Sequence, residues 1–485
     1  MGIVRKSFFR PEKRLGMIIW FMLLAGWILW LISPMFHAYF MYDDFSWLAF
    51  VRDRSITEVA LTPSPGGWTT PLSNITFWVL FQLFGTRPAG YYVFVYLLHI
   101  CNCFLVYGFM RAVFSDSRQA MLGSTLFALY FGHYIEYGPA TWVPSFVQLL
   151  VAFHYMVCMV AFVSYLRTRK PSYYVLSVVF FILALLTKET ALSLVLTLGL
   201  SWLYVTLTAE SRESRPSLWL LVPFGGILLG YLAHEISFQL SGQYVSENRY
   251  GIGMHLFTNW QYLANLVMPN IQTGSLRTFF ATSALHPYYN LILYLLYFVR
   301  VATPAILVWA FWKGDWRIRY WVAWVILTYL PFVGFRYGWA GPYRYFYLPS
   351  MGFFALVTEG LMRGFGSLKK NLGQNAIRAI GAAVLALWGV AWAFPIRIWV
   401  TQMCENSVVR REVIDTVLEL QQTSDNSINL VYLVDFPERF NDLSYGVPIL
   451  TGVNAQWVSQ PVSLGKGEIA FELAGDAVII SAVDE

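Results

Sequence analysis

The chain has 485 residues, of which 57% are hydrophobic and only 12% are charged, whereas an average soluble protein is about 25% charged. So few charged side chains cannot cover the surface of soluble domains, and so many apolar residues exclude intrinsic disorder. The net charge of +6 does not indicate nucleic-acid binding, because no basic run is interleaved with aromatic residues. The composition therefore predicts an all-α polytopic membrane protein.

Apolar segments long enough to cross a bilayer, which takes about 20 residues, follow one another along the chain. We predict about 11 transmembrane helices, at residues 15–36, 89–112, 118–134, 143–166, 172–187, 189–207, 217–236, 288–312, 318–335, 345–363 and 376–397. No cleavage site with small residues follows the first run, so we interpret it as a retained helix. Two shorter apolar runs, 72–84 and 256–268, predict helices that lie at the membrane interface.

The distribution of positive charge predicts the orientation. Nineteen of the 33 Lys and Arg residues fall in short segments on one side of the predicted spans, which places the N-terminus in the cytoplasm. The outer side receives four loops, a turn at Lys188 and the tail. The loops cover residues 37–88, 135–142, 237–287 and 336–344. Nearly all residues capable of chemistry therefore lie on the outer side.

The tail differs from the rest of the chain because it carries clustered acidic residues. Residues 408–421 predict an amphipathic helix, and residues 429–435 and 478–482 predict strands. We therefore predict two domains, a transmembrane domain over residues 1–400 and a small extracytoplasmic α/β domain over residues 401–485.

The first outer loop brings two adjacent carboxylates, Asp43 and Asp44, directly after a membrane helix. Adjacent carboxylates repel one another, which raises one pKa, and a carboxylate that titrates near neutral pH can take a proton from a hydroxyl. The alternative is structural, with Asp44 as the N-cap of a short helix over residues 45–59.

Two further outer segments carry ionisable residues close to the membrane. His133 and Glu136 are three residues apart, a spacing that suits two metal ligands on one helix turn but equally a hydrogen-bonded helix end. Lys188 and Glu189 interrupt a long apolar run. They are either a functional pair, with an ammonium suited to a phosphate, or a neutralised turn between two short helices.

The last outer loop carries Arg336 and Arg344 among aromatic residues that include Tyr343 and Tyr345. A guanidinium group pairs with phosphate through two parallel hydrogen bonds. The alternative is an aromatic belt at the membrane interface with arginines reaching toward water.

Four motifs in this order resemble the GT-C glycosyltransferases, near the protein O-mannosyltransferases and the lipid A aminoarabinose transferase. The motifs are Tyr42-Asp43-Asp44 and the segments 127–136, 186–191 and 343–352, and the resemblance covers roughly residues 15–400. The chain departs from the family in two places. Its tail has no tetratricopeptide repeats, and Tyr130-Phe131 replaces the usual histidine-proline pair.

The resemblance implies transfer of a sugar from a polyprenyl-phosphate-linked lipid donor to a hydroxyl of a glycan, lipid or protein. It makes Asp43 the general base, with Asp44 as second choice, and places Lys188, Arg336 and Arg344 at the donor phosphate. Glu189, Tyr343 and Tyr345 would support them. His133 and Glu136 would contact the acceptor or a divalent metal, which is the one cofactor considered.

Other functions fit the same composition. An O-antigen ligase or polymerase would take a whole lipid-linked glycan, and a transporter or flippase would move a lipid-linked sugar without chemistry. A scaffold with the tail as its binding module is a further alternative. The compact tail favours the inner membrane of a bacterium.

Overall fold

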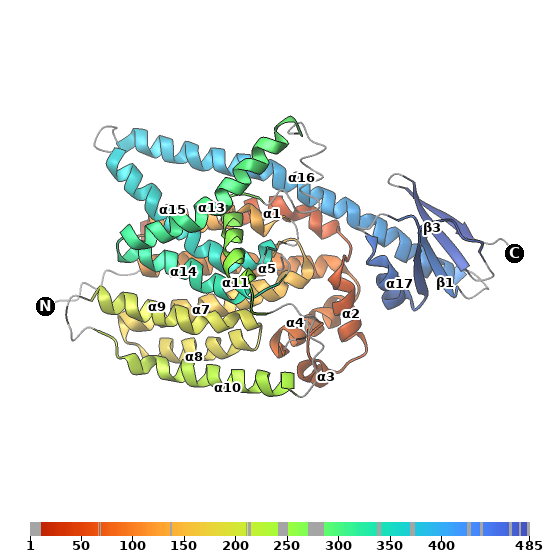
Figure 1. Ribbon diagram of the computed structural model, residues 1–485, viewed down its shortest axis with the longest axis horizontal. Coiled ribbons are helices and arrows are strands. Elements are labelled where there is room, and N and C mark those ends of the chain that lie inside the picture. Colours follow the sequence, from red (N-terminus) through yellow and green to blue (C-terminus); the bar gives the residue numbers. More distant parts are fainter. Residues whose placement is uncertain are drawn as a thin grey trace.

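The structure is a computed structural model. It describes residues 11–65, 67, 69–135, 138–209, 211, 215–240, 251–269, 286–336, 341–368, 374–423, 428–436, 440–464, 468–474 and 477–482. Helices form a bundle, and a small sheet lies beyond one end of it (Figure 1).

Six segments of the described chain form helices long and apolar enough to cross a membrane. They are Leu15–His37, Pro88–Phe114, Val143–Thr168, Glu189–Leu207, Leu218–Phe238 and His286–Lys313. They contain α1 (Pro11–Ile32), η1 (Ser33–His37), α5 (Pro88–Phe114), η3 (Val143–Ser145), α7 (Phe146–Thr168), η4 (Glu189–Ser193), α9 (Leu194–Leu207), η6 (Leu218–Leu221), most of α10 (Val222–Leu240), η8 (His286–Tyr288) and α13 (Tyr289–Lys313). Apolar side chains on the outside of the bundle are exposed, for example Met22 at 70% and Val301 at 73%. The prediction of an integral, multi-pass helical membrane protein is confirmed.

The other five predicted spans also coincide with helices, but none of these meets both criteria of length and hydropathy among the described residues. They are α6 (Ser117–Ala128), α8 (Pro171–Leu185), α14 (Trp316–Val333), α15 (Tyr347–Leu368) and the first half of α16 (Gln374–Thr423). With 12 and 15 residues, α6 and α8 measure only about 18 and 22 Å, less than the roughly 30 Å of hydrocarbon.

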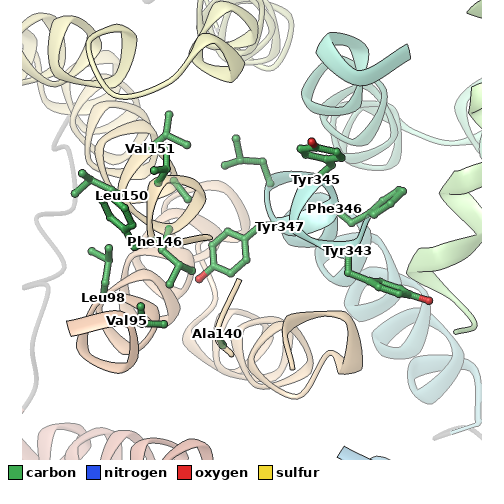
Figure 2. Packing of buried hydrophobic residues seen from close by; sticks show 14 of the residues in the cluster. Val95, Leu98, Ala140, Phe146, Leu150, Val151, Tyr343, Tyr345, Phe346 and Tyr347 are labelled. Atoms are coloured by element: carbon green, nitrogen blue, oxygen red, sulfur yellow. The ribbon is translucent and has the colours of Figure 1, made fainter. Parts of the chain in front are cut away.

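Aromatic residues fill the centre of the bundle. The indole N–H of Trp324 on α14 donates to the carbonyl of Leu348 on α15 at 3.0 Å. The two helices approach closely because Gly352 has no side chain, and a Cβ there would collide with the Trp324 ring. From the same segment, Tyr347 points across the core toward Phe146 (Figure 2).

The segment after the first span folds into α2 (Asp43–Arg52), α3 (Ile56–Leu61) and α4 (Pro71–Phe84). The prediction of one helix over residues 45–59 is wrong, because the chain breaks after Arg52. Ser55 restarts it as the N-cap of α3, in a capping box with Glu58. The predicted helix at 72–84 is α4, and residues 256–268 hold α11 (His255–Thr258) and η7 (Asn259–Leu266).

The chain ends in a four-stranded sheet that α16 connects to the bundle. α16 has 50 residues and is about 75 Å long, so the separately predicted span 376–397 and helix 408–421 are one helix. In Figure 1 it runs along the bundle and out to the sheet. The helix continues across residue 400, where the sequence predicts the domain boundary. The division into two domains stays a prediction.

The sheet has the order β2-β1-β3-β4, from strands β1 (Leu430–Val434), β2 (Asn454–Val458), β3 (Glu468–Ala474) and β4 (Ala477–Ala482). β1 pairs in parallel with β2 and β3, and β3 pairs antiparallel with β4. Helix α17 (Leu443–Thr451) precedes β2 and packs against it. The predicted strands 429–435 and 478–482 are β1 and β4, so a small α/β unit at the C-terminus is confirmed.

Candidate active site

The two acidic residues of the first outer loop lie in different environments. Asp43 is exposed at the first position of α2, whereas Asp44 is fully buried. Burial raises the pKa of Asp44 well above its usual range, with the Met41 N–H opposing the shift and the neighbouring Asp43 adding to it. Asp43 is therefore the solvent-exposed carboxylate of the two.

The N-cap interpretation of Asp44 is wrong. Its Oδ2 accepts a hydrogen bond from the backbone N–H of Met41 at 2.7 Å. Met41 lies before the helix, whereas an N-cap side chain accepts from an N–H inside it. The N-cap of α2 is Tyr42, whose side chain makes no capping hydrogen bond. Asp44 Oδ1 is buried and has no hydrogen-bond partner in the described structure.

Helix α2 is anchored by Trp47, which packs between two other elements. The Trp47 ring centroid lies 5.1 Å from that of Phe77 on α4 and 5.6 Å from that of Phe146 on α7. α2 also contacts η3, which directly follows Trp142. The short helix that carries Asp43 is thus fixed against both the first and the second outer loop.

The turn that carries Lys188 is held by α4. The N–H of Leu72 donates to the carbonyl of Leu186 at 3.0 Å, and Ser73 Oγ donates to the carbonyl of Thr187 at 2.8 Å. Lys188 itself is half-buried. No ion pair joins Lys188 to Glu189, although both lie in the described chain. The structure contains the turn without this ion pair, so the choice between a functional pair and a structural turn stays a prediction.

Arg344 contacts two aromatic rings. Its guanidinium carbon is 5.0 Å from the ring centroid of Trp142 and 4.8 Å from that of Tyr345, and its Nη2 donates to the Tyr345 hydroxyl at 3.3 Å. A guanidinium group beside aromatic faces is attracted to the ring electrons and keeps further N–H donors for other partners. Within the described residues no carboxylate pairs with Arg344. Its charge is therefore not neutralised by an acidic side chain of the described chain.

The other predicted residues of the last outer loop contact neighbouring segments. The Arg336 guanidinium lies directly against Gly251, where a Cβ would overlap it. Tyr343 is buried, with its ring 5.8 Å from that of Phe131, and it points away from Tyr345 (Figure 2). Tyr345 stacks on Phe332 at 4.5 Å, so it both orients Arg344 and closes the core.

The structure places His133 in the core rather than among the exposed loops. It is fully buried on η2 (Phe131–His133), with its Nε2 3.4 Å from the hydroxyl of Ser350 and its ring 5.1 Å from that of His99. His99 in turn bonds the hydroxyl of Tyr347 at 2.8 Å. Glu136 lies outside the described residues, so the predicted His133–Glu136 pair stays a prediction.

The part of the chain that the structure describes contains no group of three His, Cys, Asp or Glu residues that could hold a metal ion. Among the described residues, the predicted site offers an exposed carboxylate (Asp43), an ammonium (Lys188) and a guanidinium beside two rings (Arg344). Contacts of α2 with η3 and α4, together with those of Trp142 and Ser73, place them at one end of the bundle. We refer to the end that carries Asp43, Trp142, Lys188 and Arg344 as the Asp43 end; it also carries α2, α3 and α4 in Figure 1.

Two charged residues near the Asp43 end belong to no motif. Arg410 on α16 and Asp442 before α17 form a buried ion pair, with 2.7 Å between Nε and Oδ2. Both occur in the polar tail, where charged residues are ordinary in sequence. The signal that sets them apart is burial, which only the folded chain reveals.

Comparisons with known proteins give structural similarity alone. No protein-family model and no curated protein matches the chain. Among solved structures, the chain is similar to ArnT from Cupriavidus metallidurans bound to undecaprenyl phosphate, with a TM-score of 0.49 and 14% sequence identity over 92% of this chain and 86% of that one. The apo state of the same protein gives a TM-score of 0.48, with the same identity and coverage.

Proposed function

We propose that the protein is a membrane glycosyltransferase that moves a sugar from a polyprenyl-phosphate-linked donor to an acceptor hydroxyl at the Asp43 end. The observation that carries the proposal is Arg344, a guanidinium group beside Trp142 and Tyr345 without a carboxylate partner in the described chain. Such a group suits a phosphate. The ordered motifs that resemble the GT-C enzymes support a prenyl phosphate as the donor.

The reaction follows from the charges present. As the acceptor oxygen attacks the anomeric carbon, the bond from that carbon to the donor phosphate breaks, and negative charge develops on the phosphate. Arg344 and Lys188 stabilise that charge. Asp43 takes the proton of the acceptor hydroxyl. Attack from the side opposite the phosphate inverts the anomeric centre.

The membrane location follows from the donor. A polyprenyl chain stays in the hydrocarbon, so the phosphate reaches the protein at the membrane surface. Lys188 directly precedes the span Glu189–Leu207, and Arg344 precedes α15, which coincides with a predicted span. We further propose that the Asp43 end and the sheet are extracytoplasmic and that the host membrane is a bacterial inner membrane.

The first test is transfer by the purified full chain, supplied with a panel of labelled polyprenyl-phosphate sugars. Asp43→Asn should lower turnover by about 10²- to 10⁴-fold, because the acceptor loses its base. The matched control is Asp53→Asn, which removes another exposed carboxylate just after α2 and should leave turnover unchanged. Full turnover by Asp43→Asn would refute the role of Asp43, and lipid flux without a covalent product would favour a transporter.

A second test addresses the phosphate. Arg344→Lys keeps the positive charge but loses the planar group that contacts the rings of Trp142 and Tyr345, so kcat/KM for the donor should fall at least about tenfold. Arg54→Lys is the control, because Arg54 also lies over a ring, 4.7 Å from the Phe50 centroid, at an exposed site. Equal donor kinetics in the two variants would exclude Arg344 from the phosphate site.

A further inference from the structure

The ion pair between Arg410 and Asp442 is buried to an unusual degree. The side chains are 1% and 0% exposed. A buried ion pair contributes little net stability, because removing both charges from water offsets their attraction. In a chain with only 12% charged residues, such a pair requires an explanation beyond stability.

The pair encloses Tyr42 from two sides. Asp442 Oδ2, which accepts from Arg410, also accepts the backbone N–H of Tyr42 at 2.6 Å. The Arg410 guanidinium carbon lies 5.0 Å from the centroid of the Tyr42 ring, and it is held in place by a hydrogen bond to the carbonyl of Asn406 at 2.9 Å. Two residues of the C-terminal part thus hold both the backbone and the ring of one residue in the first outer loop.

Tyr42 needs to be held, because its backbone is strained. Its φ of 54° and ψ of −125° lie outside the regions that residues with a side chain readily adopt. Such a conformation persists only when surrounding contacts enforce it. Asp43 follows immediately and begins α2. The backbone conformation of Tyr42 therefore sets the orientation of the Asp43 side chain.

Neighbouring contacts fix the same segment. Ser407, one turn before Arg410, accepts the N–H of Tyr39 at 2.8 Å, and Arg411 Nη2 donates to the carbonyl of His37 at 2.8 Å. Residues 37–42 are therefore attached to α16 at several points. Among these contacts, those of Arg410 and Asp442 reach the residue next to Asp43.

We propose that Arg410 and Asp442 are positioning residues for the reaction: they hold Tyr42 so that Asp43 faces the acceptor hydroxyl. This inference rests on the proposed function and extends it, because it makes α16 and the segment before α17 part of the active site. Neither residue contacts the substrate, and their effect passes through Tyr42.

The kinetic test uses the full-length protein at a temperature where every variant is folded. Arg410→Gln and Asp442→Ala should each lower kcat at least about tenfold, since displacement of a catalytic group is costly. KM for donor and acceptor should change less than about threefold, because binding groups are untouched. Asp442→Asn keeps an oxygen that can accept the Tyr42 N–H, so it should lose less of kcat than Asp442→Ala.

The matched control is Arg363→Gln. It removes ion pairs of Arg363 with Asp315 and Glu359, at 2.5 and 2.7 Å. Arg363 lies about 24 Å along α15 from its start beside Arg344, away from the Asp43 end, so kcat should stay unchanged.

A second readout does not depend on activity. Amide hydrogen exchange of peptides that cover residues 39–45 should accelerate in Arg410→Gln and Asp442→Ala but not in Arg363→Gln. If Asp442→Ala unfolds the whole protein, exchange rises in all helices, and the milder Asp442→Asn variant takes its place.

The two readouts separate the outcomes. A selective fall in kcat with faster local exchange supports the inference. Wild-type kcat in folded variants, or unchanged exchange at residues 39–45, overturns it. If the wild-type protein transfers no sugar from any donor, the proposed function fails, while hydrogen exchange still decides whether the ion pair holds Tyr42.

Discussion

Two adjacent aspartates, Asp43 and Asp44, lie in different environments, one exposed and one buried. The sequence predicts that the repulsion of adjacent carboxylates raises one pKa. The structure shows which one and why: Asp44 is buried and Asp43 is exposed, and burial is the larger cause. The resemblance ranked Asp43 before Asp44, but the burial of Asp44 could not be predicted from the sequence, because it arises only when the chain folds.

The raised pKa of Asp44 predicts how stability depends on pH. A carboxyl group whose pKa is higher in the folded state binds a proton more tightly there, so the protein loses stability as pH rises from the unfolded pKa through the folded one. Asp44→Asn removes that loss. The variant should therefore be the more stable protein at neutral and higher pH, by up to about 1.4 kcal/mol for each unit of pKa shift, and the difference should vanish below pH 4.

Thermal unfolding in detergent between pH 4 and pH 9 measures this difference. The control Asp53→Asn changes an exposed carboxylate, and its Tm curve should follow that of the wild type. Parallel curves for wild type and Asp44→Asn would show that Asp44 is ionised in the folded protein.

At the scale of elements, the helices were largely predictable but their junctions were not. Lys188 and Glu189 break a long apolar run, and the sequence predicts a turn there, which the structure contains. The sequence does not predict that Ser73 holds this turn, because Ser73 and Thr187 lie 114 residues apart. Ser55 and Glu58 form a capping box that starts a second helix, so residues 45–59 are not one helix.

The link between α4 and the Lys188 turn is testable. Ser73→Ala leaves the buried carbonyl of Thr187 without its hydroxyl donor, so it should lower the free energy of unfolding by about 1–3 kcal/mol. It should also weaken donor binding, because Lys188 becomes less fixed. Thr76→Ala is the control: its hydroxyl bonds only the carbonyl of Leu72 in its own helix, at 2.7 Å. Equal effects of the two substitutions on stability and on donor KM would contradict the link.

At the scale of the whole molecule, composition alone established the class of protein, and the pattern of Lys and Arg predicted its orientation. The continuity of α16 could not be predicted in this way. Its apolar and amphipathic halves have different compositions, and the sequence suggests two elements where the backbone continues as one. Arg410 and Asp442 were missed because their burial and their ion pair arise only when the chain folds.

The orientation can be tested with single cysteines in a protein whose native cysteines are replaced. Ala49 is exposed on α2, and Lys170 is exposed between α7 and α8. Ala49→Cys should react with a membrane-impermeant maleimide added to intact spheroplasts of the expressing bacterium. Lys170→Cys should react only after permeabilisation, because it lies on the basic side. The reverse pattern would invert the topology and place the proposed reaction in the cytoplasm.

The continuity of α16 has a mechanical consequence. The helix lies along the apolar bundle in its first half and carries Arg410 in its second half. A change of tilt in the first half therefore moves Arg410 to the extent that the helix does not bend at Pro395. Helices respond to the thickness of the surrounding hydrocarbon by tilting. Through Arg410 and Tyr42, α16 would act as a lever between the bilayer and the Asp43 carboxylate, so that the acyl chains of the host lipids would help to set the reactivity of the site.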